Sequence, residues 1–487
     1  MQRHMAMRTF WARVSLALAC AVLSAQAGAA HAQERGPRTR ESARLGIDQR
    51  FFRDELGRAV ILRGVNARVQ GLFDVTFDDG RLPLENIPEL AAEDCRRMAE
   101  LGLHVVRLPL NWSAIEPQKD VFDPTYLKRV DRAVSCLRRE GIYTLLDLHQ
   151  DAYSKEIGED GAPLWAIVPP PEMLLGGPLG STLLDRRLAP QTIAAFDSFF
   201  AVGDPSGLQA QFIEMLQYVA KHFANEEWVI GIDLFNEPFT QPEPLEPFNT
   251  RAAEAVRAVA PSMVLFFEPT GLSTFNGGEP VGARTMPVAG TMYGPHIYDI
   301  VLFGTEDQRV NLTRADLEPA FQRTAQEASD WGKPWMIGEF GAGPGVTNYE
   351  KYLTFHYDLQ DEYLVSSALW LWKEDSQDAW GLFDRVNGEW VERPKMVNVV
   401  SRPHAVRIAG TPTRMQLAAG ALTVAYANAF RAPNVLFIPE RFRVTEVRCD
   451  GKVVAAKTCG TNLIEVSCGR GAAHELTVSL EPRTQTD

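Results

Sequence analysis

Positive charge is scarce in this sequence: 49 lysines and arginines stand against 62 aspartates and glutamates, for a formal charge of -13. Proteins that bind nucleic acids or anionic membranes need a basic face, so this balance argues against both partners. Metal-ligand spacings such as CxxC or HExxH are also missing. We therefore expect neither a metal nor another cofactor.

Long apolar runs are missing as well, apart from a short one near the start. Three arginines precede the run Val14–Leu23, and Ala30–Ala32 (AHA) forms an A-x-A cleavage pattern. The run is far short of the ~20 residues that span a bilayer, so residues 1–32 are predicted to be a secretory signal peptide. A lipoprotein signal through Cys20 is the weaker alternative. We expect a secreted or periplasmic monomer without an integral membrane segment.

Cysteine is rare, and five cysteines remain once residues 1–32 are removed: Cys95, Cys136, Cys449, Cys459 and Cys468. An odd number leaves at least one thiol free or intermolecular. One local bridge is expected among the three C-terminal cysteines, in a pairing that spacing does not fix. The other two lie on helical patterns, where a bridge and two buried thiols are equal alternatives.

Short apolar runs alternate with amphipathic helical patterns through most of the chain. Residues 126–140, for example, place four aliphatic side chains on one stripe of a helix. Apolar strands separated by helices indicate a parallel sheet covered on both faces. Eight such repeats favour a (β/α)8 TIM barrel over residues 45–402. A doubly wound open sheet is the main alternative, but no Gly-rich phosphate loop follows the first strand. The eight predicted strands are Ala59–Gly64, His104–Leu108, Ile142–Leu148, Val229–Phe235, Met263–Phe267, Gly290–Tyr293, Trp335–Gly338 and Ser367–Leu371.

The pattern changes after residue 402. Residues 403–487 show little helical periodicity and many short strand-like runs, separated by turn signals such as Asp450-Gly451. We predict that this part forms a small C-terminal antiparallel β-sandwich domain.

Two carboxylates follow predicted strands four and seven, at the strand ends where barrel enzymes place their functional groups. They belong to Glu237 and Glu339, and we expect them to face one another across the barrel mouth. Hydrolysis of a glycosidic bond needs such a pair, one to protonate the leaving oxygen and one to attack or stabilise the anomeric carbon.

Other strand-end residues suit the same chemistry. Arg107 and Tyr298 are candidates for keeping the nucleophile ionised, because a positive charge and hydrogen-bond donors lower a carboxyl pKa. His149 and His296 are candidates for binding hydroxyls or tuning the acid, with buried core histidines as the alternative.

Aromatic and acidic residues near the last strands extend the set. Trp372 offers a flat apolar face for a sugar ring, and Trp370, two residues earlier, alternates with it. Solvation in loops is an adequate explanation for four further acids near strand ends: Glu116, Glu268, Glu374 and Asp375.

Together these residues resemble glycoside hydrolase family five. Asn236-Glu237-Pro238 and Gly338–Gly341 (GEFG) match two of its motifs, and Arg107, His149, His296-x-Tyr298 and Trp372 match its remaining pattern in order. Within the family, three segments are most similar to the endoglycoceramidase group: 147–154 (DLHQDAYS), 161–166 (GAPLWA) and 234–239 (LFNEPF).

The resemblance implies a retaining β-glycosidase that cleaves the sugar–lipid bond of glycosphingolipids by double displacement. Glu237 would be the acid/base and Glu339 the nucleophile. Asn236 would bind the sugar 2-hydroxyl, and Asp151 and Trp165 would contact the sugar near the cleavage point.

Two features leave the substrate open. The lysine that endoglycoceramidases place after the first strand is not found here, and Arg68 is the candidate replacement. The segment Ala152–Pro205 is long for a loop, and its apolar residues between Leu164 and Leu175 suit either a lipid aglycone or a lid packed on its own barrel.

A glycolipid or another β-glycoside is therefore the expected substrate. A β-glucan, a β-mannan or a steryl glucoside is the alternative within the same chemistry. From another class, the alternative is a catalytically inactive carbohydrate-binding protein, against which the intact carboxylate pair argues.

Overall fold

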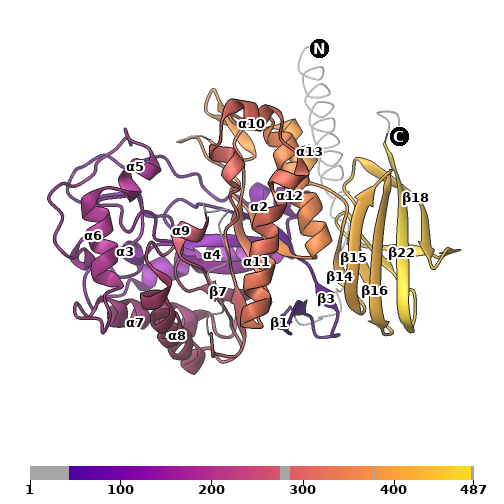
Figure 1. Ribbon diagram of the computed structural model, residues 1–487, viewed down its shortest axis with the longest axis horizontal. Helices are drawn as coiled ribbons and strands as arrows, with labels where there is room; N and C mark the ends of the chain where they lie inside the picture. The colour runs from indigo at the N-terminus through magenta and orange to yellow at the C-terminus, as the bar shows by residue number, and fades with distance from the viewer. Residues whose placement is uncertain (1–42, 275–285, 377–378, 484–487) are drawn as a thin grey trace, which may run out of the picture. The chain divides into compact units, whose positions relative to one another are not determined.

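The computed structural model contains the predicted barrel of eight parallel strands (Figure 1). It describes residues 43–274, 286–376 and 379–483, so the predicted signal peptide lies outside the described residues. The strands follow one another around the barrel, and bridges between the chain after β9 and the β10 region bring the two sheet edges together. The barrel strands are β4(Arg63–Asn66), β5(Val105–Leu110), β6(Tyr143–Leu148), β7(Val229–Asp233), β8(Val264–Phe267), β9(Thr291–Tyr293), β10(Met336–Phe340) and β11(Ser366–Leu369).

Helices connect these strands, as a parallel sheet requires. The longer ones are α2(Ala92–Glu100), α4(Pro124–Arg139), α7(Leu208–Phe223), α8(Pro242–Val259), α11(Glu318–Trp331) and α12(Tyr349–Tyr363). Shorter helices lie in the loops or after the barrel: α3(Trp112–Ile115), α5(Leu183–Arg187), α6(Pro190–Phe199), α9(Gly271–Thr274), α10(Glu306–Val310) and α13(Pro394–Val400), with 3-10 turns at Leu164–Ala166, Ile300–Phe303 and Arg314–Asp316.

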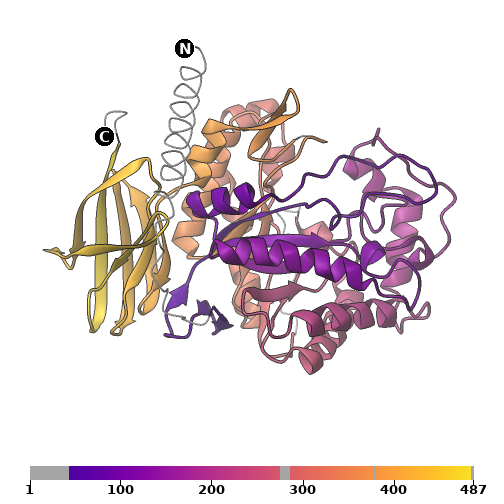
Figure 2. The same ribbon diagram turned by 180° about the vertical axis from the view of Figure 1, so that it is seen from behind.

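Helix α4 shows why the sequence pattern succeeds. Its predicted stripe, Leu127, Val130, Val134 and Leu137, is buried against the barrel. Asp123 caps the helix by accepting a hydrogen bond from the Thr125 backbone N–H, which satisfies a donor that the first turn leaves unpaired. Figure 2 shows α4 running beside α2 on the outside of the barrel.

The first predicted strand, 59–64, is divided between two sheets. Residues β3(Ala59–Val60) pair with β14(His404–Ile408) of the C-terminal part, and only from Arg63 does the chain run in the barrel as β4. The whole run is buried, because its first residues belong to a C-terminal sheet and its last ones belong to the barrel. An apolar run predicts a buried strand, but it does not say which sheet buries it.

Two antiparallel sheets form the C-terminal part, and their inner faces share one apolar core. One sheet has the order β15(Thr411–Ala418), β16(Ala421–Ala429), β22(Gly471–Pro482), β18(Phe442–Cys449) and β19(Lys452–Val453). The other has the order β1(Gly46–Ile47), β2(Phe52–Arg53), β3, β14, β17(Asn434–Phe437), β21(Leu463–Val466) and β20(Ala456–Gly460). A separate hairpin, β12(Phe383–Val386) with β13(Glu389–Glu392), follows the barrel.

The predicted division into 45–402 and 403–487 stays a prediction. Strands β1 to β3 precede the barrel in the chain but pair with the C-terminal strands, so one sheet takes strands from both sides of the proposed boundary.

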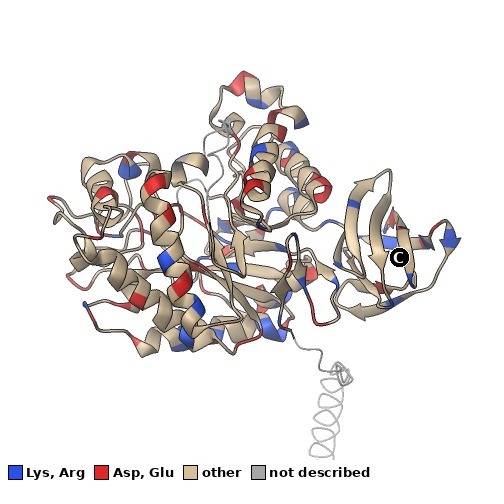
Figure 3. Ribbon diagram, turned by 60° about the horizontal axis from the view of Figure 1, so that its bottom comes forward, with Lys and Arg blue, Asp and Glu red and all other residues tan. Residues whose placement is uncertain are grey.

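Charges of both signs are interspersed along the helices in Figure 3, in keeping with the acidic balance of the sequence. In the part of the chain that the structure describes, each helix is too short or too polar to cross a membrane.

Two disulfides join cysteines that the sequence singled out. Cys95 of α2 is bonded to Cys136 of α4, and Cys449 is bonded to Cys468. Cys459 carries an exposed free thiol. The structure thus selects one of the three possible C-terminal pairs and favours the helix–helix bridge over two buried thiols.

Replacing both Cys95 and Cys136 by Ala should lower the free energy of unfolding by about 4 kcal/mol. The bridge spans a sequence separation of 41, and closing a loop of that length restricts the unfolded chain by roughly that amount. Urea unfolding of the oxidised protein measures the difference. C459S is the control and should change stability by less than about 0.5 kcal/mol. An equally small change in the double variant would contradict the bridge.

Candidate active site

The guanidinium of Arg107 lies at the centre of the barrel mouth. It projects from β5, is fully buried, and lies within 2.6–3.1 Å of four carboxylates, those of Asp147, Asp233, Glu268 and Glu339. Burial opposes its charge, but these carboxylates outweigh burial and hold its pKa well above the usual value. Arg107 therefore remains a cation and fixes the strand ends around it.

Glu339 lies near the end of β10 and is held by two donors. Arg107 donates to its Oε1 at 2.6 Å, and the Tyr298 hydroxyl donates to its Oε2 at 3.0 Å. Burial raises the pKa of this carboxyl above its ordinary value, although His296 and Arg107 oppose the shift. Arg107 and Tyr298 thus contact this residue as expected, but burial outweighs the lowering of the pKa that was expected of them.

Glu237 follows β7 and adopts a positive φ of 42°, a region that non-glycine residues enter at a cost of roughly 1–3 kcal/mol and that recurs at active sites. Its Oε1 accepts a hydrogen bond from His296 Nδ1 at 2.8 Å, and its Oε2 accepts one from Arg187 at 2.6 Å. Burial opposes ionisation, but Arg187 and His296 outweigh it and lower the pKa to about 2. In this arrangement Glu237 is the more acidic member of the pair.

Glycines allow two close approaches around Glu237. A Cβ at Gly338 would lie 2.9 Å from His296 Nε2, and one at Gly271 would lie 2.8 Å from the Glu237 carbonyl oxygen. Any larger residue at either position would displace the imidazole or the backbone of the acid.

Asn236 joins the same network from the residue before Glu237. Its Oδ1 accepts a hydrogen bond from Arg107 at 2.9 Å. Its buried Nδ2 has no hydrogen-bond partner within the described residues, so an amide donor is available at the site.

His149 is held at the end of β6 by Asp147, whose Oδ2 lies 2.7 Å from Nδ1. The imidazole is stacked on Trp370, with ring centroids 5.4 Å apart and an interplanar angle of 12°. Burial lowers the pKa of His149, but Asp147 and Asp160 outweigh burial and raise it to about 10. His149 therefore carries a positive charge, and its imidazole ring lies nearly parallel to the indole of Trp370 at the mouth.

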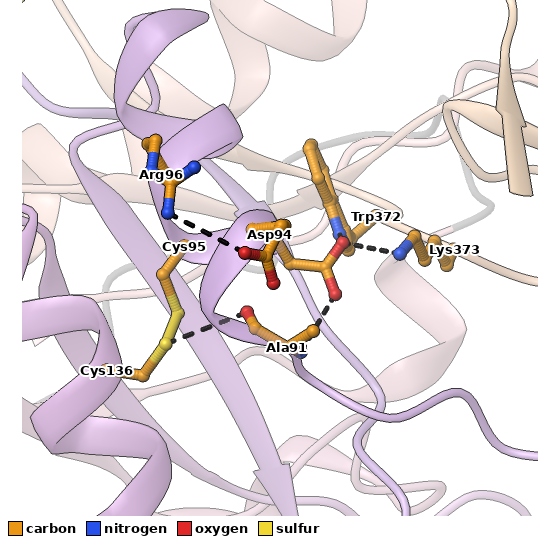
Figure 4. The surroundings of a disulfide bond; sticks show 8 residues. Ala91, Asp94, Cys95, Arg96, Cys136, Trp372 and Lys373 are labelled. Atoms are coloured by element: carbon orange, nitrogen blue, oxygen red, sulfur yellow. Dashed lines mark hydrogen bonds and ion pairs between the residues drawn. A yellow bond between two sulfur atoms is a disulfide. The ribbon is translucent and has the colours of Figure 1, made fainter. Parts of the chain in front are cut away.

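Trp372, the predicted sugar platform, lies elsewhere. Its buried indole N–H donates to Asp94 of α2 at 3.1 Å, beside Lys373 and the Cys95–Cys136 bridge (Figure 4). Strand β11 ends at Leu369, so strand alternation no longer governs the two tryptophans. Trp370 takes the position that the sequence analysis gave to Trp372.

Of the two predicted sugar contacts, Asp151 is linked to Glu237, whereas Trp165 makes its contacts elsewhere. Asp151 accepts two hydrogen bonds from Arg187 Nη2, each at 2.7 Å, and the same nitrogen binds Glu237. The half-buried Trp165 instead meets Trp112 edge-on and donates to the Glu116 carbonyl at 3.3 Å.

Arg187 is the site residue that sequence reasoning missed. It is the last residue of α5, within the long segment 152–205, and its buried side chain joins Asp151 to Glu237. Consecutive arginines in a loop carry no catalytic signature, so neither composition nor spacing pointed to it.

Three of the four acids explained by loop solvation are instead buried. Glu116 accepts a hydrogen bond from the Trp112 indole N–H at 2.8 Å, and the other two lie in ion pairs. Glu268 contacts Arg107 and accepts a hydrogen bond from the Glu237 backbone N–H at 2.9 Å. Glu374 binds Arg68, which also contacts Glu85 and Glu159. Arg68, the candidate replacement for a sugar-binding lysine, is therefore already surrounded by three carboxylates.

Two trios of ionisable groups have ligand atoms within 4.8 Å of one another: Asp233, Glu268 and His296, and Glu237, His296 and Glu339. Arg107 already binds the Asp233, Glu268 and Glu339 carboxylates, so the positive charge that these acids require is supplied by the chain itself.

The family match agrees with this geometry. Residues 85–376, more than half of the chain, match Cellulase (glycosyl hydrolase family 5). The chain belongs to glycosyl hydrolase family 5. It is therefore a glycoside hydrolase, and the predicted family and enzyme class are confirmed.

Two proteins that are similar to this chain are named endoglycoceramidases. Endoglycoceramidase I of Rhodococcus hoagii is 29% identical over 61% of this chain and 63% of its own length. An endoglycoceramidase of Cyanea nozakii is 27% identical over 38% of this chain and 40% of its own. The alignments thus span less than two thirds of either relative.

A solved structure covers more of the fold. Endo-glycoceramidase II from Rhodococcus sp., in complex with the ganglioside GM3, aligns with 89% of this chain and 99% of its own, at 25% identity and a TM-score of 0.74. The barrel and the C-terminal sheets are therefore shared with an endoglycoceramidase of known structure.

Substitution of the two tryptophans of this family 5 enzyme should have different effects, one on activity and the other on stability. W370A should lower kcat/KM on an aryl β-glycoside by about tenfold to a hundredfold, because it removes the ring stacked on His149. W372A should mainly destabilise the fold, by about 3–5 kcal/mol, as expected for a buried indole. Steady-state kinetics and urea unfolding give the two readouts, and an activity loss confined to W372A would restore the original prediction.

Proposed function

We propose that this enzyme is an exported, retaining β-glycosidase that hydrolyses the sugar–lipid bond of glycosphingolipids. One observation carries the chemistry: a carboxylate oxygen of Glu237, one of Glu339 and a nitrogen of His296 all lie within 4.8 Å of one another. Retaining glycosidases place their two carboxyl groups about 5–5.5 Å apart, whereas inverting enzymes leave about 6.5–9.5 Å for a water molecule. The close approach supports double displacement.

In this mechanism Glu339 is the nucleophile and Glu237 the acid/base. The Glu339 carboxylate forms a bond to the anomeric carbon while Glu237 gives its proton to the departing aglycone oxygen. Water then attacks the same carbon, loses a proton to Glu237 and releases Glu339. Arg107 and Tyr298 hold the Glu339 oxygens in place for the attack, which suits a group that must remain oriented through both steps.

Three further groups are suited to bind the sugar. The unpartnered amide of Asn236 points to a hydroxyl acceptor, which the family resemblance identifies as the 2-hydroxyl. His149 offers a charged imidazole and Trp370 a half-buried ring beside it. Asp151 contacts the sugar while it also binds Arg187. Trp165 lies at the outer part of the mouth.

The lipid part of the substrate rests on the surface of the segment 152–205. The apolar residues of this segment differ in burial: Ile167 is buried, and Leu175 packs partly buried against Phe73 and Val75. Other apolar side chains of the segment are exposed to solvent, by 36% to 86%: Leu164, Val168, Met173, Leu174, Leu184, Leu188, Ile193 and Val202. Exposed apolar side chains on a segment that also contributes Arg187 to the site suit a lipid aglycone.

Export fits the chemistry of the cysteines. Two disulfides are present in the described residues, and disulfides persist in oxidising compartments. We propose cleavage of the signal peptide after Ala32, which leaves a protein that meets its substrate outside the cytosol and acts as a monomer.

Azide rescue tests the two roles. E339G should abolish turnover, and azide should restore it by occupying the space of the lost nucleophile, giving an α-glycosyl azide. E237A should lose most activity on poor leaving groups, and azide should then give the β-glycosyl azide. Product anomers are read by NMR, and exchanged outcomes would mean that the two roles are reversed.

Substrate choice tests the lipid assignment. The wild type should hydrolyse a glycosylceramide, and M173S/L174S/L184S should lower kcat/KM on it by about tenfold to a hundredfold, because buried apolar area contributes roughly 25 cal/mol per Å². The same variant should leave a small aryl glycoside unaffected. V453S, which alters an exposed valine of β19, is the matched control. Activity on a soluble β-glucan with none on glycosylceramide would overturn the glycolipid assignment and leave the family assignment intact.

A further inference from the structure

Each carboxylate oxygen of Glu237 accepts a hydrogen bond from a cationic group. His296 Nδ1 lies 2.8 Å from Oε1, and Arg187 donates to Oε2 at 2.6 Å. A general acid must present its O–H to the leaving oxygen within hydrogen-bond reach. Cationic donors at these distances oppose protonation of the carboxyl, so Glu237 carries a proton more readily when one of them moves away.

His296 is the fixed partner. It is 1% exposed, its backbone bridges to Glu339 beside β10, and its Nε2 lies 3.2 Å from Glu268. Its ring also rests against Gly338, where no side chain intervenes. Moving His296 would disturb the barrel wall itself.

Arg187 is the partner that can leave. It ends a five-residue helix of the long segment. Leu184 of that helix and Leu188, directly after it, are 62% and 52% exposed. Its Nη2 also binds both oxygens of Asp151 at 2.7 Å. If Arg187 moves off Glu237, its charge stays paired with Asp151 and the cost of a bare buried cation is avoided.

The charges around Glu237 make Arg187 decisive. Positive groups face it from α5 (Arg187), from the chain after β9 (His296) and from the end of β6 (His149), and negative ones from Glu339 on β10 and Glu268 after β8. Among these cations, the two histidines project from barrel strand ends. Arg187 alone in this set comes from a loop helix.

We infer that Arg187 is a positioning residue that holds Glu237 as a carboxylate in the substrate-free enzyme and leaves Glu237, while keeping its pairing with Asp151, when the aglycone enters. The inference rests on the proposed acid/base role of Glu237. Arg187 thereby opposes the first step, in which Glu237 must carry a proton, and favours the second, in which Glu237 takes one from water. Entry of the aglycone moves Arg187 away from Glu237, so Arg187 no longer opposes the protonation that the first step needs.

The pH dependence of R187M tests the inference. Above the pKa values of both carboxyls, the fraction of enzyme with Glu237 protonated and Glu339 ionised rises with the pKa of Glu237, whereas below them it does not. Removing a close cation raises a carboxyl pKa by about 1–3 units. On an alkyl glycoside, the ratio of kcat/KM for R187M to that for the wild type should therefore rise about tenfold to a thousandfold with increasing pH.

Two comparisons separate this effect from damage to the fold. With a 2,4-dinitrophenyl glycoside the first step needs no proton, so the same ratio should not change with pH. R187K should restore the wild-type profile, and R186M, which removes the neighbouring charge that binds Glu159, should give a ratio independent of pH.

The kcat values test the displacement. Since kcat/KM reports the free enzyme and kcat the complex, the kcat ratio on the alkyl glycoside should not change with pH. A kcat ratio that also rises with pH would show that Arg187 stays on Glu237 in the enzyme–substrate complex. A kcat/KM ratio that does not change with pH would show that Arg187 does not control the protonation of Glu237. Either result overturns the inference. A wild type without glycosidase activity, or one unaffected by E237A, would instead overturn the proposed function.

Discussion

The buried charge of Arg107 is the constraint on which the rest of the barrel mouth depends. Four carboxylates, three on β6, β7 and β10 and one directly after β8, surround one guanidinium, and a buried carboxylate is costly to ionise without a counter-charge. An arginine suits this position because its planar fork presents several donors and keeps its charge when buried. Lysine has one nitrogen and loses its proton more readily, so it would not hold the four strand ends in register.

A second set of ion pairs fixes the segment 152–205 to the barrel. Arg186 and Arg68 both bind Glu159, and Arg68 reaches Glu374 after β11. Charge thus fastens the inner side of the segment while apolar side chains cover parts of its outer side. Buried apolar residues such as Phe196 and Phe199 also anchor the segment in the barrel core, and the exposed apolar residues are those that neither the core nor the ion pairs use.

The proton affinities of the proposed catalytic pair are the reverse of what the first step of the proposed mechanism needs. Glu237 is held ionised by Arg187 and His296, and burial raises the pKa of Glu339. In a retaining enzyme the acid/base must serve in both protonation states, so a cation that can move is a direct means of changing its pKa between steps. Placing that cation on a loop helix rather than on a strand gives it the freedom to do so.

The sequence by itself determined the barrel, the antiparallel C-terminal sheets and the order of the strand-end residues, because apolar periodicity and local motifs record burial and chain direction. Glu237 and Glu339 could be named because each directly follows or ends an apolar strand. Tertiary structure alone decided which sheet takes residues 59–64, because both would bury the same apolar run. It also placed Trp370 rather than Trp372 at the mouth, since alternation fails where β11 ends, and brought Arg187 onto Glu237 across 50 residues of chain. Contacts between a loop and a strand end depend on the path of the whole loop, and no local pattern encodes that path.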